Sequence, residues 1–227
     1  MTHIIPKDDE QALSLYLRKH CKRQDNPLKR GFDIVFSALV LIFGAPIYSI
    51  IAIIIKFTSK GPVLYPSKRI GICGKVIYCW KFRSMVQNAD QKLAALLESD
   101  PKLKKEWNET FKLKSDPRIT KIGAFLRKTS LDELPQFWNV LKGDLSTVGP
   151  RPLSATEVLI VIEKGHKKIF SVRPGLTGLW QTSGRNLIQY EKRILLEKEY
   201  VEKQSLLLDL KLILKTITMM IFPKGAY

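Results

Sequence analysis

The chain has 227 residues, enough for one domain of ordinary size together with a membrane element, and it contains no internal repeat or low-complexity tract. Its 38 lysines and arginines outnumber 21 acidic residues, which gives a formal net charge of +17. So large an excess of positive charge predicts an anionic partner, which could be a nucleic acid, an anionic lipid or a phosphorylated substrate.

The cysteines and histidines argue against two kinds of stabilising framework. Cysteine occurs three times, at Cys21, Cys73 and Cys79, and an odd number is not expected of a protein held together by disulfides. We therefore expect a reducing, cytoplasmic setting for the soluble part of the chain. The three histidines are scattered along the sequence, which argues against a zinc site.

Residues 1–28 form a polar arm of mixed charge. Acidic residues near its start, such as Asp8 and Glu10, distinguish it from the basic beginning of a signal peptide. Leu13 and Leu17 indicate a short amphipathic helix. We expect this arm to lie on the membrane or on the domain.

Residues 34–55 form an apolar segment without a formal charge. As one helix, these 22 residues would extend about 33 Å, enough to cross a hydrocarbon core of about 30 Å. A helix buried in a soluble core is the poorer alternative, because such helices rarely stay apolar on every face for so long. The segment therefore predicts insertion into a membrane.

Basic residues flank this segment on both sides, with Lys29 before it and Lys56 and Lys60 after it. The positive-inside rule places both flanks on the cytoplasmic side. Pro46, in the middle of the run, removes a backbone hydrogen bond and predicts a kink. A re-entrant helix over residues 29–57 that bends there and returns to the same face satisfies both flanks. A straight span remains the alternative.

The rest of the chain, residues 58–227, predicts a catalytic domain of short strands and several helices. Residues 63–65 and 76–82 have the composition of strands. The basic turn at 67–71 between them could meet phosphate or be a solvated hairpin loop. Residues 87–115 predict a helical hairpin insertion, and further helices are expected at 135–143, 154–166, 191–203 and 206–222. Charges within the last of these favour an amphipathic helix at the membrane surface or against the core. The expected fold class is therefore α/β and mostly helical, with amphipathic interfacial helices.

Two adjacent acids, Asp132 and Glu133, follow a basic run and precede the helix expected at 135–143. One carboxylate could attack a phosphorus atom while its neighbour holds a metal ion. Ser130 and Glu133 also have the spacing of a capping box, which needs no catalysis. A capping box explains Glu133 but leaves Asp132 unexplained, so both interpretations stay open on the local sequence.

Arg151 lies between two prolines, Pro150 and Pro152. The prolines restrict the backbone on both sides, which would present the guanidinium in one direction. The guanidinium fork suits bidentate binding of phosphate, although a rigid surface loop would have the same sequence. Residues 173–186 mix glycines, arginines and a tryptophan, as expected where a nucleotide or sugar packs against backbone.

Six motifs in order along the chain resemble those of the bacterial sugar transferases, a family of monotopic polyprenyl-phosphate sugar-1-phosphate transferases. The motifs are Lys29–Asp33, Trp80–Met85, Asp116–Thr120, Arg127–Gln136, Val148–Leu153 and Arg173–Gly178. The resemblance covers nearly everything from Lys29 onward. The insertion at 87–115 resembles the catalytic domains of the larger members. Two departures are Pro66–Ser67, where the family often has arginine or glutamine, and Glu197, where aspartate is common.

The resemblance implies a two-step transfer. Asp132 would attack the β-phosphorus of a UDP-sugar and release UMP, and undecaprenyl phosphate would then take the phosphosugar from the aspartyl intermediate. The resemblance also assigns Glu133 to Mg²⁺. The residues that would grip substrate phosphates are Arg127 and Arg151, followed by Lys81, Arg118 and Arg185.

The resemblance also implies partners and a location. We expect the protein at the bacterial inner membrane, with its catalytic domain on the cytoplasmic face and in contact with anionic lipids. A homodimer in the plane of the membrane is compatible with this placement. No nucleic-acid partner is expected, because zinc-finger spacing and RNA-binding motifs are absent from the sequence. The rival classes are a membrane-tethered nucleic-acid-binding protein and a scaffold anchored by its apolar helix. Nothing in the sequence indicates which sugar is transferred.

Overall fold

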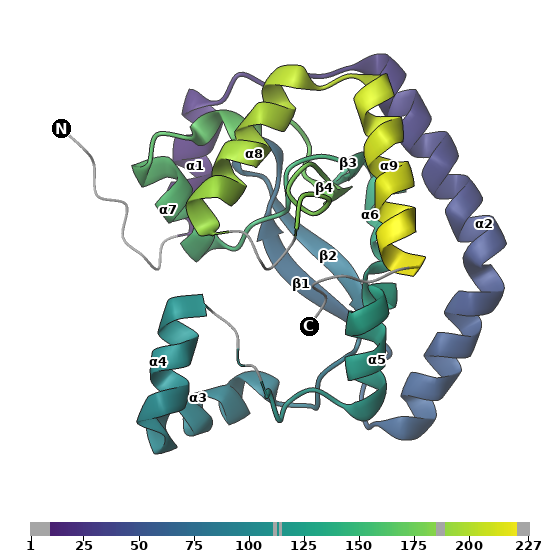
Figure 1. Ribbon diagram of the computed structural model, residues 1–227, viewed down its shortest axis with the longest axis vertical. Helices are drawn as coiled ribbons and strands as arrows, with labels where there is room; N and C mark the ends of the chain where they lie inside the picture. The colour runs from purple at the N-terminus through teal and green to yellow at the C-terminus, as the bar shows by residue number, and fades with distance from the viewer. Residues whose placement is uncertain (1–9, 111–112, 114, 185–188, 222–227) are drawn as a thin grey trace.

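The computed structural model describes residues 10–110, 113, 115–184 and 189–221 (Figure 1). In chain order, with η for a 3-10 helix, the elements are α1 Glu10–His20, α2 Pro27–Thr58, β1 Leu64–Ile70, η1 Ile72–Gly74, β2 Val76–Phe82, α3 Ala89–Ser99, α4 Pro101–Thr110, α5 Lys121–Thr129, η2 Leu131–Glu133, α6 Gln136–Lys142, β3 Ser146–Val148, α7 Ala155–Glu163, η3 Lys167–Ser171, β4 Gly175–Thr177, α8 Tyr190–Lys203 and α9 Leu206–Ile221. The predicted class, mostly helical with short strands, is confirmed.

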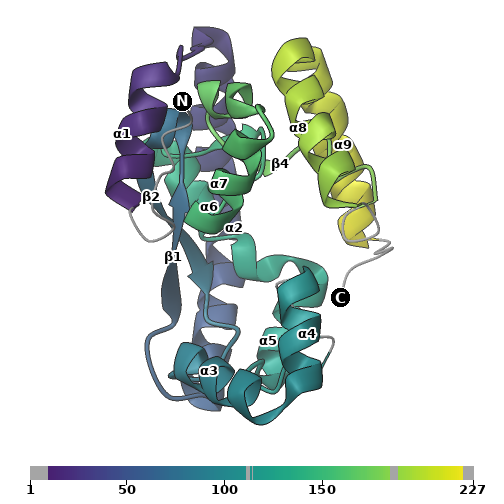
Figure 2. The same ribbon diagram turned by 90° about the vertical axis from the view of Figure 1, so that its left-hand side faces the viewer.

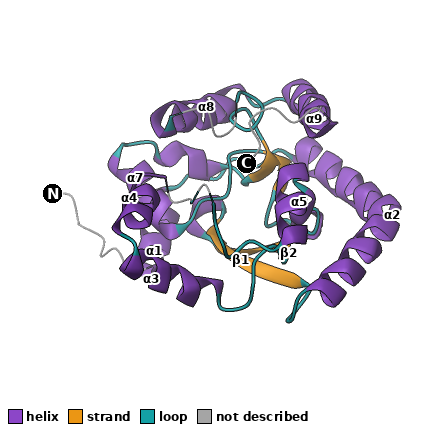
Figure 3. Cartoon of the chain, turned by 60° about the horizontal axis from the view of Figure 1, so that its bottom comes forward, coloured by secondary structure: helices purple, strands orange, loops and turns teal. Residues whose placement is uncertain are grey.

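Two small sheets lie among the helices. Strands β1 and β2 form an antiparallel hairpin, and β3 and β4 form a short parallel pair. Figure 3 shows the hairpin in the middle of the molecule, between α2 on one side and α1, α3 and α7 on the other. The hairpin therefore lies between the two sides of the fold.

Helix α2 is one continuous helix of 32 residues, and it is long and apolar enough to cross a membrane. It begins at Pro27, where the side chain of the preceding Asn26 accepts a hydrogen bond from Lys29 N. Pro46 lies inside it, and Figure 1 shows the helix bending through its middle turns and curving around one side of the domain. A proline at this position lacks the N–H that would bond the preceding turn, which accounts for a bend there.

The first half of α2 is fastened to the domain by polar contacts. The buried carboxylate of Asp33 accepts a hydrogen bond from Thr147 N at 2.9 Å. The Arg30 guanidinium donates to the carbonyl oxygens of Val140 and Leu141, at 2.6 and 2.8 Å, and so satisfies the C-terminal end of α6. These contacts fix the start of the apolar helix against β3 and α6.

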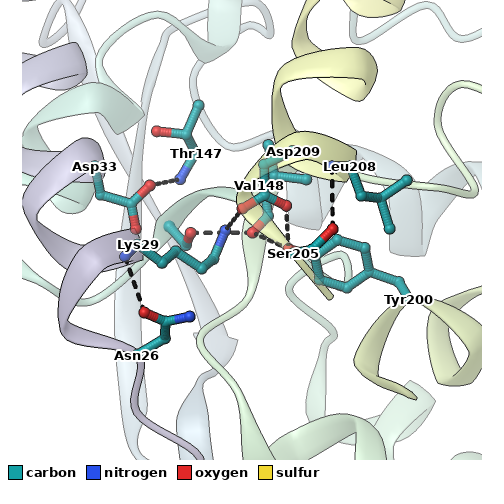
Figure 4. Close-up of polar contacts among 10 residues, drawn as sticks. Asn26, Lys29, Asp33, Thr147, Val148, Tyr200, Ser205, Leu208 and Asp209 are labelled. Atoms are coloured by element: carbon teal, nitrogen blue, oxygen red, sulfur yellow. Dashed lines mark hydrogen bonds and ion pairs between the residues drawn. The ribbon is translucent and has the colours of Figure 1, made fainter. Parts of the chain in front are cut away.

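A second buried network ties α9 to the same end of α2 (Figure 4). Lys29 Nζ lies 2.5 Å from one carboxylate oxygen of Asp209, and Tyr200 Oη donates to the other oxygen at 2.7 Å. Tyr200 Oη also lies 3.0 Å from the carbonyl oxygen of Val148. Burial raises the pKa of Tyr200, and the neighbouring Asp209 carboxylate raises it further, so the phenol remains a donor.

The second half of α2 packs on the other end of the domain. Ile55 is fully buried and lies in one cluster with Phe82 and Leu126. Tyr48 Oη donates to the carbonyl oxygen of Leu134 at 2.8 Å, beside the acid pair. Both halves of the apolar helix therefore contact one and the same domain.

Away from the domain, α2 and α9 expose apolar side chains. The exposed set on α2 includes Val35, Leu39, Ile42, Phe43, Ile47, Ile50, Ile53 and Phe57, and that on α9 includes Leu207, Leu210, Leu214 and Ile217. So many exposed apolar side chains along two helices are typical of a membrane-facing or partner-facing side.

The structure corrects the expected turn at residues 67–71. Strand β1 runs on to Ile70, with Lys68 opposite Tyr78 and Arg69 opposite Ile77, so both basic residues belong to the strand. The turn comes later, around Gly74, which has a φ of 80°. Pairing with β2 overrides the weak local signal of the basic residues.

The structure also corrects the interpretation of the cysteines. Cys21 and Cys73 form a disulfide with a Cα–Cα distance of 5.4 Å, and Cys79 is free and buried. The argument for a reducing setting from an odd cysteine count therefore falls, since an odd count only leaves one thiol over. The described part of the arm lies on the domain, because α1 buries Leu13 and Leu17 in a core cluster beside η1.

The helical hairpin predicted at 87–115 is present as α3 and α4. Figure 2 shows these two helices grouped at one end of the molecule, near α5. Helix α3 buries none of its residues, as expected of an insertion with a solvated face.

Candidate active site

The acid pair lies in η2, the single turn that joins α5 to α6. Ser130 has a φ of 59° and ends α5, with its N–H bonded to the Arg127 carbonyl oxygen at 3.2 Å. Its side chain makes no capping hydrogen bond, so the alternative interpretation of Ser130 and Glu133 as a capping box is wrong. A left-handed residue turns the chain sharply here, which prevents the extended geometry that a helix N-cap needs.

A capping box does occur elsewhere, at the start of α7. Ser154 Oγ accepts from Glu157 N at 3.4 Å, and Glu157 Oε2 accepts from Ser154 N at 2.9 Å. The same sequence spacing therefore forms a cap in one place and not in the other, and the acids of η2 are left available for another role.

Glu133 is held in its ionised form. Lys81 Nζ, from β2, lies 2.6 Å from its Oε1. Burial alone would favour the protonated acid, but the positive charges of Lys81 and Arg151 and the hydrogen bond from Lys81 outweigh it and lower the pKa of Glu133 to about 2.

Asp132, the adjacent residue, has the opposite shift. Its side chain is buried, and burial raises its pKa to about 6; the charge of Glu133 adds to the rise, while Lys81 and Arg127 oppose it. Neighbouring carboxyl groups with divergent pKa values are typical of sites that give two acids different tasks. A poorly solvated carboxylate that still ionises near neutral pH is suited to nucleophilic attack.

A pocket opens beside the pair, and three cationic side chains line it together with Glu133. They are Arg69 from β1, Lys81 from β2 and Arg151 from the loop after β3. The sequence indicated that the basic segment 67–71 could meet phosphate, but it did not single out Arg69 as a site residue. The alternation of the hairpin could have found it, because Arg69 is opposite Ile77 and shares the face that carries Lys81.

The loop that carries Arg151 crosses the loop around β4 at very close range. Gly149 N donates to Thr177 O at 2.9 Å, and Gly175 N donates to Pro150 O at 2.7 Å. A Cβ atom on Gly175 would lie 2.0 Å from Gly149 N, so no larger residue fits. The glycines of these motifs therefore let two backbones meet.

The remaining predicted phosphate-binding residues lie in different settings. Arg127 lies in the last turn of α5 and donates from Nε to Ser84 Oγ at 2.9 Å, near enough to the acids to influence the pKa of Asp132. Arg118 is buried and donates to both carboxylate oxygens of Asp116, at 2.8 and 2.6 Å, so its guanidinium is already engaged. Arg185 lies outside the described residues.

The site fits Mg²⁺ that arrives with a phosphorylated substrate. Within the described ranges, no group of three or more metal-ligating side chains occurs. Mg²⁺ is commonly held by one or two carboxylates together with substrate phosphates and water, and the ionised Glu133 with its neighbour Asp132 meets that requirement.

Comparison with known proteins decides the family. The model of the bacterial sugar transferases matches residues 24–223, nearly the whole chain. The chain belongs to the bacterial sugar transferase family. The assignment made from the six motifs is confirmed, and with it the enzyme class, a transferase.

Three curated relatives illustrate the similarity of this sugar transferase. An undecaprenyl-phosphate galactose phosphotransferase of Salmonella typhimurium is 45% identical over 207 residues, which cover 91% of this chain and 43% of the relative. The exopolysaccharide production protein ExoY of Sinorhizobium fredii is 42% identical over 199 residues, 88% of each chain. A UDP-glucose:undecaprenyl-phosphate glucose-1-phosphate transferase of Klebsiella pneumoniae is 43% identical over 206 residues, 88% of this chain and 41% of the relative. The chain thus spans less than half the length of two of these relatives and most of the third.

Proposed function

We propose that this sugar transferase moves a sugar 1-phosphate from a UDP-sugar to undecaprenyl phosphate, in the first membrane step of glycan biosynthesis. The observation that carries the proposal is the acid pair, in which Glu133 lines a cationic pocket, the buried Asp132 is adjacent to it, and the next residue, Leu134, accepts a hydrogen bond from Tyr48 of the apolar helix α2. The names of two relatives support it. Both name undecaprenyl phosphate, and that of the Klebsiella pneumoniae relative also names UDP-glucose.

In the first step, a carboxylate oxygen of Asp132 attacks the β-phosphorus of the UDP-sugar. The bond from that phosphorus to the oxygen bridging to the α-phosphate breaks, and UMP leaves with the bonding electron pair. In the second step, a phosphate oxygen of undecaprenyl phosphate attacks the same phosphorus. Asp132 leaves as a carboxylate, and a polyprenyl diphosphate sugar is formed.

The cationic side chains stabilise the negative charge that develops on the phosphoryl oxygens. Arg69, Lys81 and Arg151 line the pocket, where they would neutralise the diphosphate. Glu133 would hold Mg²⁺ together with substrate phosphate, and the bound ion would neutralise the leaving UMP.

A re-entrant placement of α2 at the inner membrane, with the domain on the cytoplasmic face, fits this reaction. Both halves of α2 contact the same domain, which supports a helix that enters and leaves by one face. We expect anionic lipids to contact the basic flanks. Cysteines introduced at Leu28 and Ser59 should both be labelled from the cytoplasmic side. Labelling from opposite sides would establish a straight span instead.

The assay for the function uses the full chain in detergent with Mg²⁺, undecaprenyl phosphate and a panel of UDP-sugars, with release of UMP as the readout. At least one UDP-sugar should give UMP. Repeated turnover should require the acceptor, because undecaprenyl phosphate regenerates Asp132. Without the acceptor, the intact protein should gain the mass of one sugar phosphate. Absence of UMP with every UDP-sugar would overturn the proposal.

A further inference from the structure

A buried carboxylate on α8 has no part in the chemistry described above. Glu197 is 3% exposed, and its Oε1 accepts a hydrogen bond from the backbone N–H of Arg151 at 3.0 Å. Its Oε2 is buried without a hydrogen-bond partner among the described residues. A carboxyl group placed this way is costly to bury, so its position calls for an explanation.

The contact falls on a segment that is also held by the hydrogen bond from Gly175 N to Pro150 O at 2.7 Å. Pro150 and Pro152 have no backbone N–H, so Arg151 supplies the one backbone donor of this tripeptide. Glu197 takes that donor. The peptide between Pro150 and Arg151 is therefore held by two hydrogen bonds, one at its carbonyl oxygen from Gly175 N and one from its N–H to Glu197, which is 46 residues away in the sequence.

The guanidinium of Arg151 is held by a different group. It lies 5.7 Å from the centre of the Trp180 ring, and the guanidinium of Arg193 lies 4.4 Å from the centre of the same ring. These are cation–π distances. Arg193 lies one turn before Glu197 on α8, and its positive charge repels that of Arg151.

We infer that Glu197 is a positioning residue for Arg151: by accepting its N–H, it aims the guanidinium at the pocket that contains Glu133. The inference rests on the proposed function, in which Arg151 binds the diphosphate of the donor. Glu197 acts only through Arg151, so it contributes to binding of the UDP-sugar and adds nothing when the Arg151 side chain is absent.

The experiment is a double-mutant cycle in the full chain, with KM for the UDP-sugar and kcat measured separately. We expect E197A to raise KM about tenfold, the effect of losing one hydrogen bond to a charged group, with a smaller change in kcat. E197Q keeps an acceptor oxygen and should restore most of the affinity. E197A combined with R151A should have the same KM as R151A alone. E199A is the matched control, because Glu199 is on the same helix and exposed.

Independent effects would overturn the inference. If E197A multiplies the KM of R151A by the same factor as that of the native chain, Glu197 does not act through Arg151. Melting temperature separates this result from loss of fold. Should E197A fail to fold, E197D carries the test, since a side chain shorter by one methylene weakens the contact and should raise KM above that of E197Q. Equal KM for E197D and E197Q would then refute the inference.

The outcomes also separate this inference from the proposed function. A native chain that releases no UMP with any UDP-sugar would overturn the function. A native chain that is active, with R151A impaired and Glu197 variants unaffected or additive, would overturn the positioning role alone.

Discussion

Two lysine–carboxylate pairs in this protein have similar geometry and different surroundings. Lys29 lies 2.5 Å from Asp209 between α2 and α9, and Lys81 lies 2.6 Å from Glu133 between β2 and η2. In the first pair the carboxylate is 1% exposed and Tyr200 bonds its other oxygen. In the second pair the side chains are 21% and 28% exposed and border a pocket.

The surroundings decide what each pair can do. In the pair of Lys29 and Asp209, both carboxylate oxygens already accept hydrogen bonds from the protein. The pair therefore joins two helices and is not available to bind a ligand. The pair of Lys81 and Glu133 shares its pocket with Arg69 and Arg151, which leaves positive charge beyond what the acids balance. A site of this kind binds an anion, and we expect the two pairs to respond to mutation in opposite ways.

The largest effect is expected for D132N. The amide is not a nucleophile, so turnover should fall at least about a thousandfold and the phosphosugar adduct should be absent from the intact mass. The melting temperature should change little or rise, because the substitution removes a buried carboxylate whose pKa is raised by burial. Exposed Asp90 on α3 provides the control, since D90N should turn over normally. Turnover of D132N near the native rate would show that another group is the nucleophile.

Breaking the structural pair should destabilise the fold. D209A leaves Lys29 buried with an unpaired charge and removes the acceptor of Tyr200, which should cost about 3–5 kcal/mol of unfolding free energy. Thermal unfolding in detergent measures this cost. D209N, which keeps a hydrogen-bond acceptor for Tyr200, should lose less. If D209A has the same melting temperature as the native chain, the network does not stabilise the contact between α2 and α9.

Breaking the pocket pair should affect binding more than stability. K81M removes a cation that neutralises the diphosphate, so KM for the UDP-sugar should rise about ten- to a hundredfold. The pair is partly exposed, so the unfolding free energy should change by no more than about 1 kcal/mol. A comparable loss of stability in K81M and D209A would mean that the two pairs do not differ in the way proposed.

The smallest effect expected is a pH dependence of stability from Glu197. Burial raises its pKa to about 7, and Arg151 and Arg193 oppose this rise. The negative charge of Glu197 also raises the pKa of the nearby Tyr200. The folded chain thus binds this proton more tightly than the unfolded chain, so the stability gained is complete below about pH 4 and is lost as pH rises through 7. E197Q lacks this loss. Its melting temperature relative to the native chain should increase by about 5–10 °C from pH 5 to pH 8, and a constant difference would refute the assignment.

The sequence by itself determined the elements that neighbouring residues specify. The bounds of β2 follow from β-branched and aromatic residues, and α6 ends at Gly143, whose φ of 90° favours glycine. The apolar run of α2 and the hairpin of α3 and α4 follow from hydrophobic pattern. Patterns of this kind act over a few residues, so no distant contact is needed to read them.

Tertiary structure alone decided the features that depend on distant partners. Pairing with β2 drew Arg69 into a strand and into the pocket, and packing of α1 brought Cys21 to Cys73. The left-handed turn at Ser130, where the spacing of the sequence had also allowed a capping box, leaves Glu133 out of any helix cap. The divergent pKa values of the two adjacent acids in η2 have the same origin, because burial and the charges of Lys81 and Arg151 are set by the fold and not by the local sequence.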